Sequence, residues 1–272
     1  MDVKRVIGYG DSWTEGVGFD PSVEQTPDDT MPGDWLVTER KKHSWVRWLA
    51  DEYHCEWINN GVSGGSTRKA YERLMGDAKA GDIKKDDVVV FMHSSPIRDP
   101  LYFFPNIGKP IGHNEQYVDV MYLGYSLKHF IEDNPLNKSP MWWVSTENDK
   151  FNTGIDKFKR KFITSLVDYA WYDYMTFNMS LLIQYTLTEI GCKFIICDSF
   201  EKAIGDNNEI VNKNINLLTS YIRDFTMSEY VLSIDPHNFD LESTNEYIKH
   251  PNIKGYQIIA DCLYKKLEND NR

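Results

Sequence analysis

A serine directly follows the first apolar segment of the chain, where residues 10–16 read GDSWTEG. A serine on the turn that leaves a buried strand exposes its hydroxyl, and its backbone N–H can face an oxyanion. Far downstream, His250 precedes a predicted helix, so a separate loop can bring a histidine base to the serine. The two motifs predict acyl-transfer chemistry, with Ser12 as the nucleophile and His250 as its base.

Short apolar runs alternate with helix-period segments along the chain, and this alternation predicts the elements that position the two motifs. Strands are predicted at residues 3–8, 57–59, 88–92, 194–197 and 230–234. Helices are predicted at residues 44–53, 66–78, 156–190, 207–224 and 253–267, and a loop at residues 20–42. The pattern is typical of an α/β protein, so we expect one domain over residues 1–272: a three-layer α/β/α sandwich with a five-stranded, mostly parallel sheet.

Ligands of such sheets bind at the carboxyl edge of the strands, where Ser12, the loop of the 60s, the loop at 93–96 and His250 are all expected. One long irregular segment, residues 97–155, is rich in proline, asparagine and aromatic residues. A loop of this length inside a domain is usually functional or a small subdomain, so we interpret it as one large insertion. Its rings either pack that subdomain or stack on sugar rings.

The composition excludes several classes of function. A net charge of −11 leaves no excess of Lys or Arg to bind nucleic acid. The longest purely apolar run, residues 88–92, is far too short for a membrane span, and the N-terminus does not resemble a signal peptide, so we expect a cytoplasmic protein as synthesised. The four cysteines have no metal-ligand spacing and are predicted to be buried free thiols. No metal or cofactor is expected; an oligomer is compatible with the sequence.

Three blocks of the sequence, in order, resemble the SGNH (GDSL-like) hydrolase family over nearly the whole chain. The blocks are GDS at residues 10–12, NGVSGGS at residues 60–66, and HPN at residues 250–252 followed by Gly255 and residues 258–260. The resemblance implies a flavodoxin-like α/β/α fold, with Ser12 as nucleophile and His250 as base. It also implies that the backbone N–H groups of Ser12 and Gly64 bind the oxyanion, and that the substrate is an acetylated carbohydrate or a small acyl ester.

The third block of the family departs from the pattern in this chain. The family places an asparagine after the central strand as a further oxyanion donor, whereas this chain reads HSSP at residues 93–96. Ser94 or Ser95 is therefore the expected donor, through a hydroxyl group. This form of the block is similar to variants encoded by tailed bacteriophages, which implies a phage origin and, with it, association with the virion.

The last block departs as well, because Tyr247 stands where the family has an aspartate three residues before the histidine. Glu246, Asp235 and Asp240 are the acids available to orient His250. A Ser-His dyad oriented by a backbone carbonyl is the alternative.

Three further residues are predicted to bind substrate, each with a structural alternative. Trp13 lines the pocket or fills the core, His93 faces the site or packs at the end of its strand, and Arg98 binds an anionic group or pairs with a neighbouring acid. Residues 61–65 also match the G-x-S-x-G nucleophile elbow, which would make Ser63 the nucleophile instead.

We therefore expect a serine esterase that acts on a carboxylic ester, most simply an O-acetyl group of a carbohydrate. The non-enzymatic alternative is a scaffold that has lost catalysis and serves as a glycan-binding or virion structural domain. Acyl transfer to an acceptor other than water is a third hypothesis. The first two differ in geometry: an enzyme holds Ser12 Oγ within hydrogen-bond reach of His250, whereas a separation well beyond ~4 Å favours the binding domain.

Overall fold

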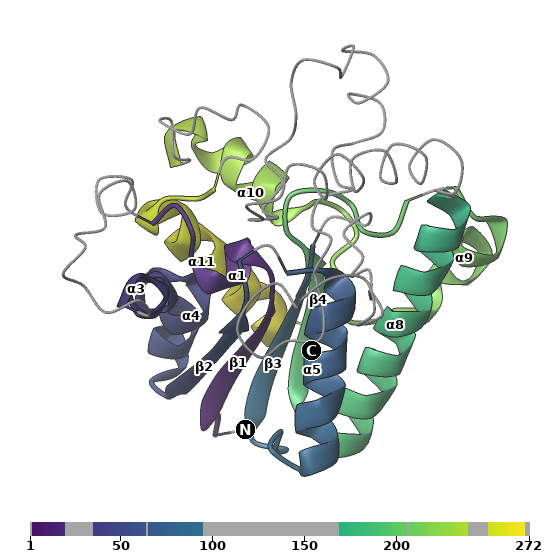
Figure 1. Cartoon of the computed structure of the whole chain (residues 1–272), viewed down its shortest axis with the longest axis horizontal. Helices are drawn as coiled ribbons and strands as arrows, with labels where there is room; N and C mark the ends of the chain where they lie inside the picture. The colour runs from purple at the N-terminus through teal and green to yellow at the C-terminus, as the bar shows by residue number, and fades with distance from the viewer. Residues whose placement is uncertain are drawn as a thin grey trace, which may run out of the picture.

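A parallel sheet forms the centre of the protein, in a computed structural model that describes residues 2–19, 35–63, 65–94, 169–205, 207–238 and 250–269. Its strand order is β2-β1-β3-β4, and every neighbouring pair runs parallel. The strands are β1 (Arg5–Gly10), β2 (Glu56–Gly61), β3 (Asp87–His93) and β4 (Lys193–Asp198). All four therefore end at one carboxyl edge, as predicted (Figure 1).

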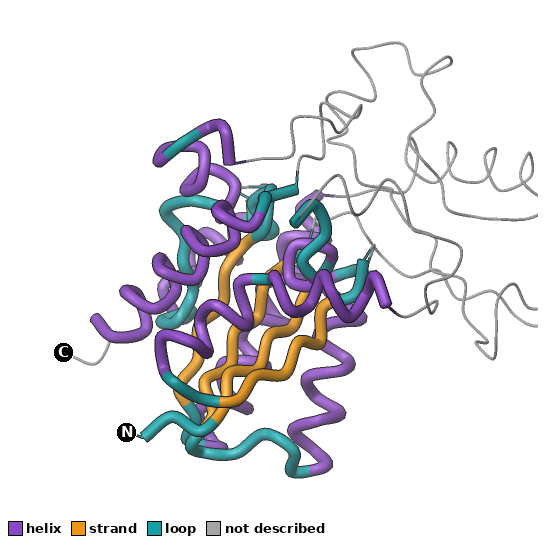
Figure 2. The backbone as a smooth tube through the Cα atoms, turned by 90° about the vertical axis from the view of Figure 1, so that its left-hand side faces the viewer, coloured by secondary structure: helices purple, strands orange, loops and turns teal. Residues whose placement is uncertain are grey.

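Helices cover both faces of the sheet and complete three layers, which confirms the predicted α/β/α sandwich (Figure 2). Helices α4 (Trp45–Tyr53) and α11 (Ile253–Asn269) pack on one face. Helices α5 (Thr67–Ala80) and α8 (Tyr169–Ile190) pack on the other.

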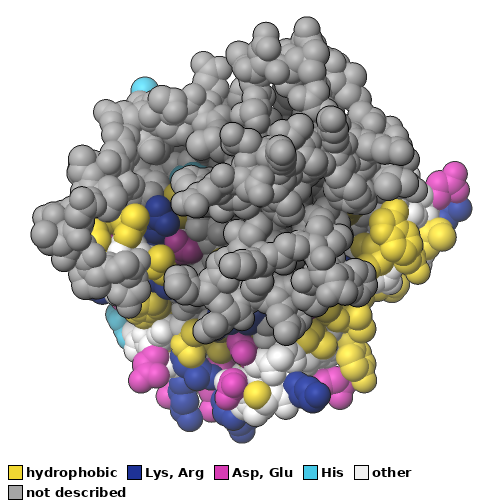
Figure 3. Space-filling model, viewed as in Figure 1, with side chains coloured by type: hydrophobic (Ala, Val, Ile, Leu, Met, Phe, Trp, Pro, Cys, Tyr) yellow, Lys and Arg dark blue, Asp and Glu magenta, His cyan; other side chains and the backbone are white. Residues whose placement is uncertain are grey.

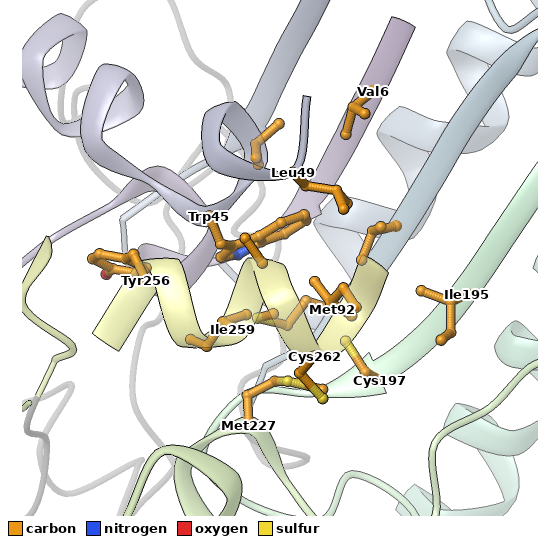
Figure 4. Packing of buried hydrophobic residues seen from close by; sticks show 14 of the residues in the cluster. Val6, Trp45, Leu49, Met92, Ile195, Cys197, Met227, Tyr256, Ile259 and Cys262 are labelled. Carbon is orange, nitrogen blue, oxygen red and sulfur yellow. The ribbon is translucent and has the colours of Figure 1, made fainter. Parts of the chain in front are cut away.

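The central strand β3 shows why the sheet is buried on both sides. Successive side chains of a strand point to opposite faces, so Val88, Val90 and Met92 face α4 and α11, while Val89 and Phe91 face α5 and α8. In Figure 4 the rings of Trp45 and Tyr256 and the side chains of Met92 and Ile259 lie in the first of these layers. Apolar residues on both faces are what a parallel strand covered by two helical layers requires.

One predicted strand is wrong. Residues 230–234 are not a fifth strand but the second half of helix α10 (Met227–Ile234). The helix begins with a capping box, in which the Thr226 side chain accepts from the Glu229 amide and the Glu229 carboxylate accepts from the Thr226 amide. The sheet of the described residues therefore has four strands.

Two further predictions need correction. Residues 207–224 are not one helix. After α9 (Glu209–Asn214) and the short η1 (Ile215–Leu217) the chain turns, and Tyr221 then makes a single parallel bridge to Ile196 of β4. Part of the predicted loop at 20–42 is instead helix α3 (Trp35–His43), supported by the Glu39–Lys42 ion pair of 2.6 Å.

The remaining predictions fall partly outside the described residues. Helix α8 covers the described part of the helix predicted at 156–190, and the insertion predicted at 97–155 lies outside. Lys, Arg, Asp and Glu side chains mix on the lower part of the surface (Figure 3). Within the described ranges no helix is both long and apolar enough to cross a membrane. Cys192, Cys197 and Cys262 are buried and Cys55 is half-buried, all as free thiols.

Candidate active site

The predicted nucleophile lies on a sharp turn between β1 and the short helix α1 (Ser12–Glu15). Only glycine fits at the end of the strand, because a Cβ on Gly10 would lie 2.2 Å from Thr14 Oγ1 and 2.9 Å from the Met92 carbonyl oxygen. Asp11 is the N-cap of α1 and accepts a hydrogen bond of 3.0 Å from the Trp13 amide. The turn thus places Ser12 as the first residue of a helix, at the carboxyl edge of the sheet.

The backbone amide of Ser12 is available as an oxyanion donor. The first N–H groups of a helix have no partner within the helix, and the Asp11 side chain satisfies only that of Trp13. Within the described ranges the Ser12 N–H has no acceptor, while the Ser12 carbonyl accepts from Gly16 and Val17. A donor that the fold leaves unpaired beside the nucleophile is what a developing oxyanion needs.

The decisive geometry is the distance from Ser12 Oγ to His250 Nε2, which is 2.9 Å. The two residues are 238 positions apart, so the whole fold is needed to bring them together. For His250 to take the Ser12 proton, Nε2 must be the unprotonated nitrogen and the ring proton must sit on Nδ1. The pair has the geometry of a nucleophile and its general base.

Gly18 and Trp13 both pack against His250. A Cβ on Gly18 would lie only 2.5 Å from His250 Cβ, so the chain after α1 fits closely against the histidine. The Trp13 ring lies on another side, with its centroid 6.4 Å from that of the imidazole. Gly18 was not predicted as a site residue.

The start of α11 fixes the loop that carries His250. Asn252 caps the helix, because its side-chain oxygen accepts from the Gly255 amide at 3.0 Å. The Asn252 amide in turn donates to the carbonyl oxygen of Asn238, in the 3-10 helix η2 (Pro236–Asn238). From the next turn of α11, the Tyr256 hydroxyl donates to the Val17 carbonyl oxygen at 2.6 Å, which ties the helix to the nucleophile turn.

Glu15 ties the nucleophile turn to the loop of the 60s. Its carboxylate is buried and accepts a 2.6 Å hydrogen bond from the Ser63 amide, while its other oxygen pairs with Arg40 at 3.2 Å. Asn59 adds a second link, because its side chain donates to the Thr14 carbonyl oxygen at 2.6 Å. Ser63 itself is exposed, and among the described residues its hydroxyl has no histidine partner, so the elbow hypothesis gains no geometric support.

Ser94 contacts the site through Asp11. Its hydroxyl donates to Asp11 Oδ2 at 2.8 Å, and its amide donates to Thr67 Oγ1 at 3.0 Å. A serine hydroxyl has one proton to donate. In this arrangement that proton is directed at the Asp11 carboxylate and not at an oxyanion beside Ser12.

Trp13 and His93 are both buried in this structure, which favours the core alternative that the sequence left open for each of them. Trp13 is only 1% exposed and packs beneath His250. His93 is fully buried on the α8 side of the sheet, where its Nε2 lies 2.9 Å from Ser180 Oγ. Since the Ser180 hydroxyl donates to the Thr176 carbonyl oxygen, His93 Nε2 carries the proton and donates. Burial lowers the pKa of His93 to about 3, so the ring is neutral.

Several predicted site residues lie outside the described residues. These are Gly64, Ser95, Arg98, Asp240 and Glu246. Of the acids expected to orient His250, Asp235 is described, and its Oδ1 accepts from the His237 amide at 3.0 Å. Among the described residues no cluster of three His, Cys, Asp or Glu side chains could hold a metal ion.

No family model matches the sequence, and no curated protein matches it. Solved structures do. The psychrotrophic esterase EstA from Pseudoalteromonas sp. is 11% identical, with 98% of this chain and 97% of that chain covered and a TM-score of 0.45. A member of the lipolytic protein G-D-S-L family from Veillonella parvula DSM 2008 is 12% identical, with 99% and 100% covered and a TM-score of 0.42. The acetyl xylan esterase AlAXEase is 14% identical, with 96% and 98% covered and a TM-score of 0.40. At these identities and scores, no assignment of function follows from the likeness.

Proposed function

We propose that the protein is a serine hydrolase of carboxylic esters, and that its substrate is an O-acetylated carbohydrate or another small acyl ester. The observation that carries the proposal is the 2.9 Å hydrogen-bond distance between Ser12 Oγ and His250 Nε2. A scaffold without catalysis has no need to hold these two groups together. The geometry therefore favours the enzyme over the glycan-binding or virion structural domain.

The reaction begins when Ser12 Oγ attacks the ester carbonyl carbon while His250 Nε2 accepts the hydroxyl proton. The carbonyl oxygen becomes an oxyanion, which accepts a hydrogen bond from the Ser12 N–H. His250 then gives its proton to the leaving alkoxide, which departs as the alcohol. Ser12 is left acylated.

Deacylation uses the same groups. His250 takes a proton from a water molecule, the resulting hydroxide attacks the acyl carbon, and the proton returns to Ser12 Oγ. The products are the free acid and the regenerated enzyme. An alcohol in place of water would turn the same steps into acyl transfer, so the acceptor must be established by product analysis.

Buried contacts support the reacting groups without touching the substrate. Asp11 caps α1 and keeps the Ser12 amide at the end of the helix. Gly64, Ser95 and Glu246 remain proposals from the sequence, as second oxyanion donor, further donor and orienting acid.

The test is hydrolysis of p-nitrophenyl acetate and of an acetylated sugar by the wild type, Ser12→Ala, His250→Ala and Ser63→Ala. Removing a nucleophile or its base typically lowers kcat by about 10⁴–10⁶. We expect losses of that order in the first two variants and near-wild-type rates for Ser63→Ala, because Ser63 is an exposed serine of the neighbouring loop.

An organophosphonate reagent makes the test independent of the choice of substrate. It should label the wild type once, at Ser12, and leave Ser12→Ala unlabelled in intact-protein mass spectrometry. Activity that survives Ser12→Ala, or labelling that moves to Ser63, would contradict the proposal.

A further inference from the structure

A cavity lies beside the carboxyl end of β4, and Ser12 is not among the residues that line it. Its volume of about 350 Å³ is within the range of small-molecule sites. The end of β4, the loop after it, helix α9 and the segment that bridges to β4 supply its walls. The polar side chains that line it are Asp198, Lys202, Asn212, Tyr221, Arg223 and Asp224.

Asp198 has an oxygen that the protein leaves without a partner. The side chain is 2% exposed, and its Oδ2 accepts a 2.6 Å hydrogen bond from the Tyr221 hydroxyl. Its Oδ1 is buried and has no hydrogen-bond partner among the described residues, although the Ala203 amide is near enough to lower the pKa of the carboxyl group. Burial raises the pKa of Asp198 to about 7, with the Tyr221 hydrogen bond acting in the opposite direction. A buried polar atom without a partner in a cavity wall points to a ligand that supplies one.

Two cations, Lys202 and Arg223, line the same cavity together with the carboxyl groups of Asp198 and Asp224. Neither Lys202 nor Arg223 forms an ion pair with a described carboxylate, although Asp224 lines the cavity too. The Arg223 guanidinium donates to the Asn216 side-chain oxygen at 3.0 Å. In a chain with a net charge of −11, two such cations beside one polar cavity favour an anionic ligand.

The walls are held in place by hydrogen bonds. Asp173 of α8 accepts from the Gly205 and Asn207 amides, both at 2.9 Å, and so fixes the far end of the loop after β4. The near end is fixed where the Ser199 amide donates to the His93 carbonyl oxygen at 3.0 Å. The loop is thus anchored at both ends, and these hydrogen bonds define the wall of the cavity.

The same loop also contacts Trp13, the residue that follows Ser12. The Phe200 ring lies 6.0 Å from the Trp13 ring, next to Ser12, while Lys202 and Gly205 line the cavity. In the sheet order β2-β1-β3-β4, the end of β4 is two strand spacings from the end of β1, roughly 10 Å. A substrate of more than one sugar unit can span that distance.

We propose that this cavity binds an acidic sugar residue, a uronate. Lys202 and Arg223 bind its carboxylate, and a ring hydroxyl forms a hydrogen bond with Asp198 Oδ1. The binding of a uronate in this cavity does not depend on the proposed function. The further role of the cavity, as a subsite for an acidic polysaccharide ester, rests on that function.

The test measures the binding of D-galacturonate and D-glucuronate to the Ser12→Ala protein by isothermal titration calorimetry or NMR. The neutral sugars galactose and glucose are the counterparts. We expect at least one uronate to bind ten times or more tightly than its neutral counterpart, and more weakly in high salt. Lys202→Ala and Arg223→Ala should each weaken uronate binding at least fivefold. Lys213→Ala is the matched control, because Lys213 is exposed on α9, pairs with Glu209 at 3.5 Å and does not line the cavity.

Equal binding of acidic and neutral sugars, no uronate binding, or affinity insensitive to Lys202→Ala and Arg223→Ala would each overturn the proposal. Turnover of p-nitrophenyl acetate by the wild type separates it from the proposed function. An active enzyme that binds no uronate refutes this inference alone, and an inactive protein that binds uronate refutes the esterase alone.

Discussion

The Ser94 hydroxyl donates a 2.8 Å hydrogen bond to Asp11 Oδ2 across 83 positions of the chain. The other oxygen of the same carboxylate caps α1 by accepting from the Trp13 amide at 3.0 Å. Asp11 therefore joins the end of β3 to the turn that carries Ser12. These contacts hold the turn of Ser12, whereas the sequence alone predicts a direct oxyanion contact for Ser94 or Ser95.

The Ser94→Ala substitution distinguishes these two roles. It removes the Ser94 hydrogen bond to the buried Asp11 carboxylate, and loss of a hydrogen bond to a buried charged group costs about 1–3 kcal/mol of folding free energy. We expect a clear drop in the free energy of unfolding by urea and a loss of kcat of tenfold or less. A direct oxyanion donor would show the reverse, a loss of kcat of about 10²–10³ with little change in stability.

The Gly18→Ala substitution tests whether close packing holds His250 at the nucleophile. The new Cβ would lie 2.5 Å from His250 Cβ, and the backbone φ of +87° is strained for any residue with a side chain. We expect kcat for p-nitrophenyl acetate to fall at least tenfold while the far-UV circular dichroism stays that of a folded protein.

Gly76→Ala is the matched control for that substitution. Gly76 lies within α5, and a Cβ there meets no other atom within 4 Å. We expect wild-type kcat and a gain of about 0.5–1 kcal/mol in stability, because alanine favours a helix over glycine. Equal activity in both alanine variants would show that Gly18 does not control the position of His250.

The layered fold was predictable because its signals are local. The valines of residues 88–92 predict a strand buried on both faces, and that is the environment of β3. The strand predicted at residues 230–234 was wrong because a short apolar run, taken alone, fits a strand as well as a helix. The signal that decides it is also in the sequence: Thr226 and Glu229 form the capping box that begins α10.

The site was predictable only as far as its motifs extend. The Ser12 and His250 motifs each follow a local rule, and the fold brings them within 2.9 Å. Gly18, Glu15 and the pairing of Asp11 with Ser94 depend on contacts between distant segments, which no local pattern encodes. His93 shows the limit of residue type: it ends β3 as predicted, but the alternation along the strand turns its ring toward α8.

The buried His93 makes the protein sensitive to acid. Burial lowers its pKa from 6.5 to about 3, so between these values the unfolded chain binds a proton that the native protein does not. The contribution of His93 to the free energy of unfolding is therefore complete above pH 6.5. It falls as the pH drops toward 3, by on the order of 4 kcal/mol in all. His93→Gln keeps a donor for Ser180 and should remove this loss. The urea midpoint of the variant relative to that of the wild type should therefore rise as the pH is lowered from 7 to 4. A constant difference between the two proteins over that range would contradict the assignment.

Asp198 has the opposite effect on the pH dependence of stability, so the contributions of Asp198 and His93 partly cancel. Its pKa is raised from 3.8 to about 7, so the native protein keeps a proton that the unfolded chain has released. This contribution to stability is fully present below pH 3.8 and is lost as the pH rises through 7, by on the order of 4 kcal/mol. Asp198→Asn cannot ionise and should gain stability relative to wild type as the pH rises from 4 to 8, measured by urea unfolding at each pH. Between pH 4 and 6.5 the losses from His93 and Asp198 run in opposite directions, so the double variant should follow the wild-type trend more closely than either single variant. If Asp198→Asn instead tracks the wild type at every pH, Asp198 is ionised throughout and the cavity beside β4 holds a charged carboxylate.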